Sequence, residues 1–164
     1  MLAHEHSELN GAKYVVFVDL SRRYVDCSPG IADLLGYPRD DMLKKTIDDV
    51  SYDVSAVPTL FAQYQRTGSQ QGDFILQHKD RRPVPIHYRA FVFDDGCNAA
   101  IWEPITDWRL PYMESLLELD SGKQQKCIDR ALAEISQHRS ADPAAQKVRE
   151  EAALLLRSMR KQLK

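Results

Sequence analysis

The fold is decided by residues 74–96, "FILQHKDRRPVPIHYRAFVFDDG". Two apolar runs flank the charged residues 80–82, and the second run continues for ten residues as "VPIHYRAFVF". Runs rich in Val, Ile, Tyr and Phe on either side of a short polar turn predict a β-hairpin.

Alternation along the second strand divides its side chains between two faces of a sheet. Ile86 and Tyr88 fall on the face that we expect helices to cover, whereas Phe91 and Phe93 fall on the opposite face. Two aromatic side chains on the outer face indicate that something covers part of it.

The segments on both sides of the hairpin complete one domain. Residues 14–27 predict a first hairpin, and Ser28 is expected to cap the short helix that follows. Residues 54–67 carry apolar side chains at helical spacing and predict an amphipathic helix. Residues 98–106, "NAAIWEPIT", predict a last strand. Strands at both ends with helices between them predict an α+β domain, in which short helices cover one face of an antiparallel sheet.

The C-terminal part of the chain is helical in character. Residues 123–138 and 144–163 each carry an apolar stripe, and Asp142-Pro143 is a typical helix start. The short connection predicts an antiparallel helical hairpin. The last helix places Val148, Ala152, Leu155 and Met159 at heptad-like spacing. Such a narrow stripe needs packing against the sheet or a partner subunit.

Composition limits the class of protein. The chain has 164 residues, 43% of them hydrophobic, with no apolar run of the length that a membrane span needs and no apolar signal core. We expect a cytoplasmic protein made of one domain and an extension.

Residues 121–164 hold ten Lys and Arg against five Asp and Glu. This excess of positive charge favours contact with the acidic remainder or with a second chain.

Residues 14–107 resemble a PAS domain. The run "LLGY" after the first hairpin, the acidic helix that follows, "GDFILQHKDRRPVPIHYRAFVFDDG" and "WEPITDW" occur in the order of that family's motifs. Three positions depart from the pattern: Ser28 replaces Asn, Arg81 replaces the turn Gly, and Pro104 replaces the Asp of the D-I-T strand end, where Asp107 is a nearby substitute.

The resemblance implies a five-stranded antiparallel sheet whose inner face lines a ligand cavity. It divides the chain into a cap or disordered segment at 1–13, a sensor domain at 14–107 and a helical extension at 108–164. The residues expected to line the pocket are Leu60, Phe61, Tyr64, Leu76, Ile86, Tyr88 and Trp102. Alternatively, these side chains fill a solid core and leave no cavity.

The cofactor is unknown from sequence, and a small organic ligand is compatible with the lining. The resemblance argues against flavin, because the adduct-forming G-x-N-C-R-F-L-Q run is missing and Cys27 and Cys97 are expected to be structural. It argues against haem, because the long helix has no His and only His78 and His87 lie on the hairpin. The His-Glu-His run at 4–6 is a weak metal motif, and no metal site is predicted.

No catalytic set of residues is present in the sequence, so we expect a sensory or interaction domain in signal transduction rather than an enzyme. Ligand occupancy or dimer contact would be relayed through the C-terminal helices to a signalling partner protein. A homodimer is expected through Phe91, Phe93, Val148, Leu155 and Met159. The alternative hypothesis is a nucleic-acid-associated transcriptional regulator that uses the basic last helix.

Overall fold

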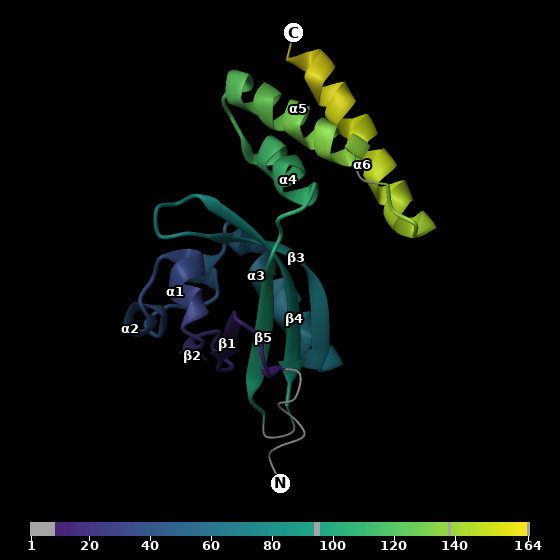
Figure 1. The fold of residues 1–164 in the computed structure, drawn as a ribbon. Helices are drawn as coiled ribbons and strands as arrows, with labels where there is room; N and C mark the ends of the chain where they lie inside the picture. The colour runs from purple at the N-terminus through teal and green to yellow at the C-terminus, as the bar shows by residue number, and fades with distance from the viewer. Residues whose placement is uncertain (1–8, 94–95, 138, 164) are drawn as a thin grey trace. The chain divides into compact units, whose positions relative to one another are not determined.

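The computed structural model describes residues 9–93, 96–137 and 139–163 (Figure 1). The chain divides into two compact units, Met1–Pro104 and Ile105–Lys164, which are described separately. Most of the predicted N-terminal segment, including His4 and His6, lies outside the described residues.

The first unit contains a five-stranded antiparallel sheet with the order β2-β1-β5-β4-β3. The predicted hairpin forms β3 and β4, with Phe74 opposite Ile86. The first and last strands of the unit, β1 and β5, pair in the middle of the sheet, so β2 and β3 are the edge strands. The strands are β1 (Val15–Val18), β2 (Tyr24–Cys27), β3 (Ser69–Gln77), β4 (Pro83–Val92) and β5 (Asn98–Pro104).

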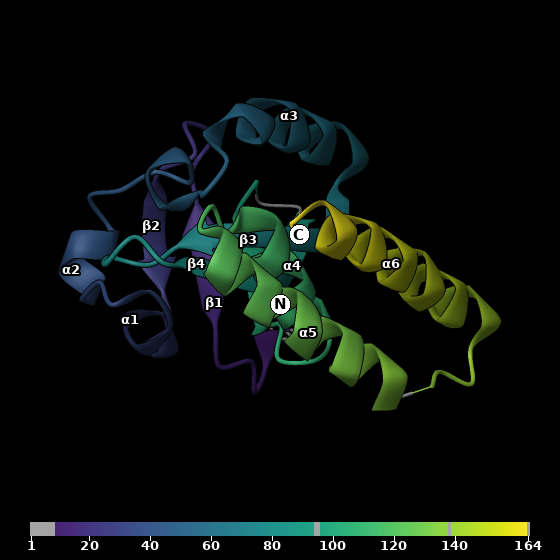
Figure 2. The same ribbon diagram turned by 90° about the horizontal axis from the view of Figure 1, so that it is seen from above.

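Short helices cover one face of this sheet, as predicted. Figure 2 shows α3 along one side of the strands, where it contacts β3 and β4. The helix ends at Gly68, whose left-handed φ of 76° suits glycine and whose N–H donates to the Tyr64 carbonyl. The helices are α1 (Gly30–Leu35), α2 (Arg39–Met42), η2 (Asp48–Val50), η3 (Val54–Ala56) and α3 (Val57–Thr67).

Apolar side chains of the short helices and the sheet form the core of the first unit. The helices contribute side chains with no solvent exposure, and the strands contribute side chains from their inner face. Burial of each such side chain stabilises the fold by about 1.5–3 kcal/mol. The innermost residues are Tyr24, Ile31, Leu35, Met42, Val50, Leu76 and Ile86.

Ser28 does not cap α1, which corrects the expectation from sequence. Its hydroxyl accepts from the Val15 N–H at 2.8 Å and donates to the Lys13 carbonyl at 2.7 Å. Helix α1 begins at Gly30, where an added Cβ would lie 2.5 Å from the Lys13 carbonyl oxygen. The Ser28 side chain therefore ties the end of β2 to the chain entering β1, because its hydroxyl is engaged with the backbone of Lys13 and Val15 instead of the first amides of α1.

Arg81 occupies a conformation that favours glycine. In the turn between β3 and β4 its φ is 73°, and its N–H donates to the His78 carbonyl at 2.8 Å. A side chain in this left-handed region costs about 1–2 kcal/mol. The turn thus has glycine geometry although the sequence supplies arginine.

We expect Arg81→Gly to raise the free energy of unfolding by about 0.5–1 kcal/mol. The glycine removes the strain of the left-handed arginine, and the entropy that glycine gains in the unfolded chain cancels part of this gain. Urea unfolding followed by far-UV circular dichroism measures the difference. Arg82→Gly is the matched control, because Arg82 is the next residue and has no positive φ, so this variant should be less stable than the parent. A loss of stability in Arg81→Gly would contradict the argument.

The second unit consists of three helices that pack together. Helices α5 and α6 form the predicted antiparallel hairpin (Figure 1), and α4 packs on α5. Asp142 caps α6 by accepting from the N–H groups of Ala144 and Ala145, as its position before Pro143 predicts. The helices are α4 (Arg109–Leu117), α5 (Ser121–Gln137) and α6 (Pro143–Gln162).

The apolar stripe of α6 is divided by this packing. Ala152 and Leu156 are buried against α5, and Met159 packs on the same cluster. Val148 and Leu155 are 56% and 45% exposed. Residues seven positions apart share one edge of a helix, and this pair flanks the buried face. Met159 is therefore partly buried within the second unit, whereas Val148 and Leu155 lie on its surface.

Candidate ligand-binding site

A cavity of about 110 Å³ lies in the first unit, lined by α3 and by all five strands. All seven residues that the sequence analysis assigned to a pocket line this cavity. None of the lining side chains is charged. The lining residues that the sequence analysis missed are Val16, Val18, Tyr24, Ile47, Val57, Gln70, Phe74, Ala90, Ala99 and Ala100.

Small residues on neighbouring strands leave room for the cavity. Ala90 of β4 lies directly opposite Ala100 of β5, and both line the cavity. Because this pair depends on strand register, only the assembled sheet shows that the two alanines meet at the cavity.

A strap, defined as residues 46–52, joins the two edge strands of the sheet. Thr46 pairs with Arg23 next to β2, and Ser51 pairs with Leu76 of β3. Backbone hydrogen bonds of 3.0 Å extend both contacts, from Tyr24 to Lys45 and from Tyr52 to Ile75. The strap thus crosses the inner side of the sheet from one edge to the other and places Ile47 against the cavity.

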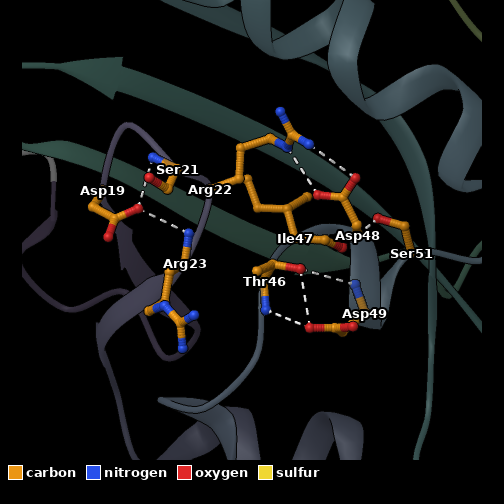
Figure 3. A network of polar contacts seen from close by, with 9 residues as sticks. All are labelled: Asp19, Ser21, Arg22, Arg23, Thr46, Ile47, Asp48, Asp49 and Ser51. Atoms are coloured by element: carbon orange, nitrogen blue, oxygen red, sulfur yellow. Dashed lines mark hydrogen bonds and ion pairs between the residues drawn. The ribbon is translucent and has the colours of Figure 1, made fainter.

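A polar network fixes the strap to the turn between β1 and β2 (Figure 3). Arg22 Nε lies 2.8 Å from Asp48 Oδ2, and Arg22 Nη2 lies 3.1 Å from Asp48 Oδ1. The Ile47 N–H donates to the Arg22 carbonyl at 2.8 Å, and Asp49 accepts from the N–H and hydroxyl of Thr46. The hydrogen bond from Arg22 lowers the pKa of Asp48 below its usual value. The ionised carboxylate therefore stabilises the strap.

We expect Asp48→Asn to lower the free energy of unfolding by about 1 kcal/mol at pH 7, because it removes one charge of a half-buried bidentate pair. The pKa of Asp48 is lower in the folded than in the unfolded chain, where it is about 3.9. The stabilisation is therefore present above about pH 4 and is lost as the pH falls through the folded-state pKa. Urea unfolding at a series of pH values should show the parent and the variant converging in acid.

Asp26→Asn is the control for this variant. Asp26 pairs with Arg39 at 2.8 Å, but both side chains are more than half exposed, so solvent weakens the pair. Its substitution should change stability less than that of Asp48. Equal effects of the two variants would mean that the Arg22–Asp48 pair has no special role in holding the strap.

Two tyrosines of the cavity differ in how their hydroxyls are satisfied. The Tyr64 hydroxyl donates to the Phe91 carbonyl at 2.5 Å. Tyr24 is 1% exposed and packs edge-on against Trp102 at 6.2 Å, and its buried hydroxyl has no hydrogen-bond partner within the described ranges. Burial raises the pKa of both hydroxyls, so both are protonated at neutral pH. An unsatisfied buried hydroxyl costs about 1–3 kcal/mol.

We expect Tyr24→Phe to raise the free energy of unfolding by about 1 kcal/mol, because it removes a hydroxyl without removing a protein hydrogen bond. Tyr64→Phe should lower it by about 1 kcal/mol, because it breaks the bond to Phe91. Both variants keep the aromatic ring, so the comparison isolates the hydroxyl. Urea unfolding of the ligand-free protein measures both. Destabilisation of the same size in both variants would show that the Tyr24 hydroxyl is bonded.

The histidines and cysteines that the sequence analysis weighed as cofactor ligands do not line the cavity. His78 lies in the β3–β4 turn, with Nδ1 2.8 Å from Asp80 Oδ1 and its ring against Gly36. His87 pairs with Asp73 at 2.7 Å on the outer face. Cys27 is buried, which raises the pKa of its thiol. These residues are engaged in local contacts around the sheet.

The outer face of the sheet carries the two aromatic residues predicted there. Phe91 and Phe93 are half-buried and stack on each other, with ring centroids 6.5 Å apart. Arg89 pairs with Glu103 at 3.1 Å on the same face. The face therefore combines an apolar end with a charged end. Its use as an interface stays a prediction.

Part of the positive charge of α6 is engaged within the second unit. The Arg149 guanidinium lies 5.6 Å from the Trp108 ring centroid, and Arg160 pairs with Asp129 at 3.3 Å. Lys147 lies 4.0 Å from Glu151. These contacts leave less unpaired charge for nucleic acid than the sequence suggests, and the alternative of a nucleic-acid regulator stays untested.

The described residues offer neither a metal-ion site nor a helix that could span a membrane. Within the described ranges, no group of three His, Cys, Asp or Glu residues is placed to hold a metal ion. In the same part of the chain, no helix combines the length and apolar character required to cross a bilayer.

Solved structures with the same fold are PAS domains. A domain of a sensory box sensor histidine kinase/response regulator from Geobacter sulfurreducens is 20% identical, with a TM-score of 0.52 over 57% of this chain and 84% of that chain. A PAS domain from Colwellia psychrerythraea is 18% identical, with a TM-score of 0.51 over 57% and 86%. The PAS domain of a LuxR-family transcriptional regulator from Burkholderia thailandensis, in complex with ethanol, is 13% identical, with a TM-score of 0.51 over 64% and 98%.

A five-stranded antiparallel sheet with short helices over one face and a cavity between them is an α+β architecture. The family model of the PAS domain matches residues 13–107, which is more than half of the chain. The chain therefore belongs to the PAS domain family. No curated protein matches the chain.

Proposed function

We propose that this protein is a sensory module that binds a small organic molecule between α3 and the sheet and relays occupancy through its C-terminal helices. The observation that carries the proposal is the uncharged cavity of about 110 Å³ inside the PAS domain. Apolar cavities of about 150 Å³ bind molecules the size of benzene. The ligand is therefore a compact molecule.

The volume favours such a ligand over a flavin or a haem. Sites for drug-sized ligands measure about 300–1,000 Å³, several times the cavity found here. The complex of the Burkholderia thailandensis PAS domain with ethanol is a precedent for a small neutral molecule in this fold. At 13% identity it supports the idea only through the fold.

Strand β5 provides the covalent path from the cavity to the helices. Trp102 lines the cavity, and β5 ends two residues later at Pro104. The chain then enters α4 at Arg109, whose N–H and Nε both lie 3.0 Å from Asp107 Oδ1. Asp107 thus orders the start of α4. A ligand that shifts Trp102 changes the strand that leads into this helix.

Within the second unit, the start of α4 is coupled to α6. The Arg149 guanidinium of α6 lies over the Trp108 ring and interacts electrostatically with Asp107. A change in the direction of residues 107–108 would therefore alter the packing of α6. The exposed Val148 and Leu155 on this helix are the residues through which a second protomer or a signalling partner would detect the change.

Filling the cavity tests the proposal. We expect the apolar probe methylenecyclopentane to bind the 164-residue chain and to change amide hydrogen exchange in α4. Ala100→Leu should weaken binding of this probe at least tenfold. Ala100 lines the cavity, and the larger leucine side chain would fill part of it. Binding is measured by NMR titration. Ala62→Leu, on the exposed side of α3, is the matched control and should bind like the parent. Absence of probe binding to the parent would show that the lining only fills the core.

A further inference from the structure

Helix α6 has a second face that is exposed along its whole length. One side of the helix packs on α5, where Ala152 and Leu156 are buried. The solvent side carries residues spaced alternately four and three positions apart, a spacing that places them along one line of a helix. We call this line the outer stripe, and all of its members are exposed: Ala144, Val148, Glu151, Leu155, Ser158 and Gln162.

Apolar side chains gather at the centre of this face. Val148 and Leu155 belong to the outer stripe, and Leu154 lies beside it with 63% of its surface exposed. Single apolar side chains are common on protein surfaces, but a group of them on one face marks an interaction site. A second helix laid along the outer stripe would remove all three side chains from water.

The charges on the solvent side of α6 are divided between its two halves. The first half holds Glu150 and Glu151 with Lys147, whose Nζ lies 4.0 Å from Glu151. The second half holds Arg157 and Lys161, and no carboxylate in the described part of the chain forms an ion pair with either of them. Neighbours on a helix surface are three or four residues apart, so these two cations repel each other and lie too far along the helix to pair with the two glutamates.

We propose that α6 pairs in antiparallel orientation with α6 of a second copy of this chain, the two helices crossing near Leu154. Glu150 and Glu151 precede Leu154 by four and three residues, and Arg157 follows it by three. The glutamates of each copy would therefore lie beside Arg157 of the other, and Leu154 would meet its own equivalent. This inference deepens the proposed function, because it names the partner that contacts α6.

The division of charge favours a second copy in this orientation over other occupants. A parallel pair would place glutamates beside glutamates and cations beside cations. An acidic partner would pair with Arg157 and Lys161 but would also lie against Glu150 and Glu151. An antiparallel copy brings opposite charges together at both ends, opposes the two helix dipoles and uses one self-complementary surface twice. Because the contact is confined to one helix, the dimer is expected to be weak.

Two charge-reversed variants of the 164-residue chain test the proposal by sedimentation velocity over a concentration series. One carries Glu150→Lys with Glu151→Lys, and the other carries Arg157→Glu with Lys161→Glu. We expect the parent to dimerise and each variant alone to dimerise about tenfold more weakly, because like charges then face each other at both ends. An equimolar mixture of the two variants should associate at least as tightly as the parent. Recovery in the mixture also shows that both variants are folded.

Matched controls separate the outer stripe from general effects of charge and apolar surface. Arg66→Glu with Lys79→Glu makes the same change in net charge at two exposed residues of the first unit and should leave dimerisation unchanged. Leu154→Ser should weaken dimerisation about tenfold. Leu119→Ser is its control, because Leu119 follows α4, is 96% exposed and lies outside α6.

Three outcomes would overturn the antiparallel pair. The parent could remain a monomer at every concentration, the reversed variants could each dimerise as tightly as the parent, or their mixture could fail to recover association. None of these results bears on the cavity, whose occupancy is measured by titration with methylenecyclopentane. Failure of the dimer and failure of ligand binding are therefore distinguishable.

Discussion

The contact of the strap with both edge strands is the constraint on which the ligand cavity depends. An open antiparallel sheet has two unpaired edges, and here residues 46–52 pair with both of them. The Arg22–Asp48 pair fixes the strap to the turn before β2, and Ile47 then forms part of the cavity wall. Without this connection, the inner face of the sheet would be covered by α3 and the remaining short helices alone.

The cavity is where the fold departs from close packing. Facing alanines on β4 and β5 leave space at the cavity that larger side chains would fill. The buried Tyr24 hydroxyl adds a second cost, because it is removed from water without a partner among the described residues. Unfilled space and unsatisfied polar groups both lower stability.

Several residues that line the cavity were predictable from sequence because they follow a simple period. The strand period of two placed Ile86 and Tyr88 on the inner face, and the helical spacing of α3 placed Leu60, Phe61 and Tyr64 toward them. Tyr24 and Ile47 were missed, because one lies on a short edge strand and the other in an irregular strap. Met159, which the sequence analysis assigned to an interface, is partly buried against the cluster between α5 and α6, and its use as an interface stays a prediction.

The sequence by itself determined the elements of this protein: the hairpin of β3 and β4, the helix that ends at Gly68, the capped start of α6, and through their order the PAS fold. These features depend on local alternation, turn chemistry and capping, which act over a few residues. Only the tertiary structure decided which small side chains meet, how the strap crosses the sheet and which hydroxyl lacks a partner. Such features depend on register and on contacts between residues distant in the chain, and no local pattern encodes them.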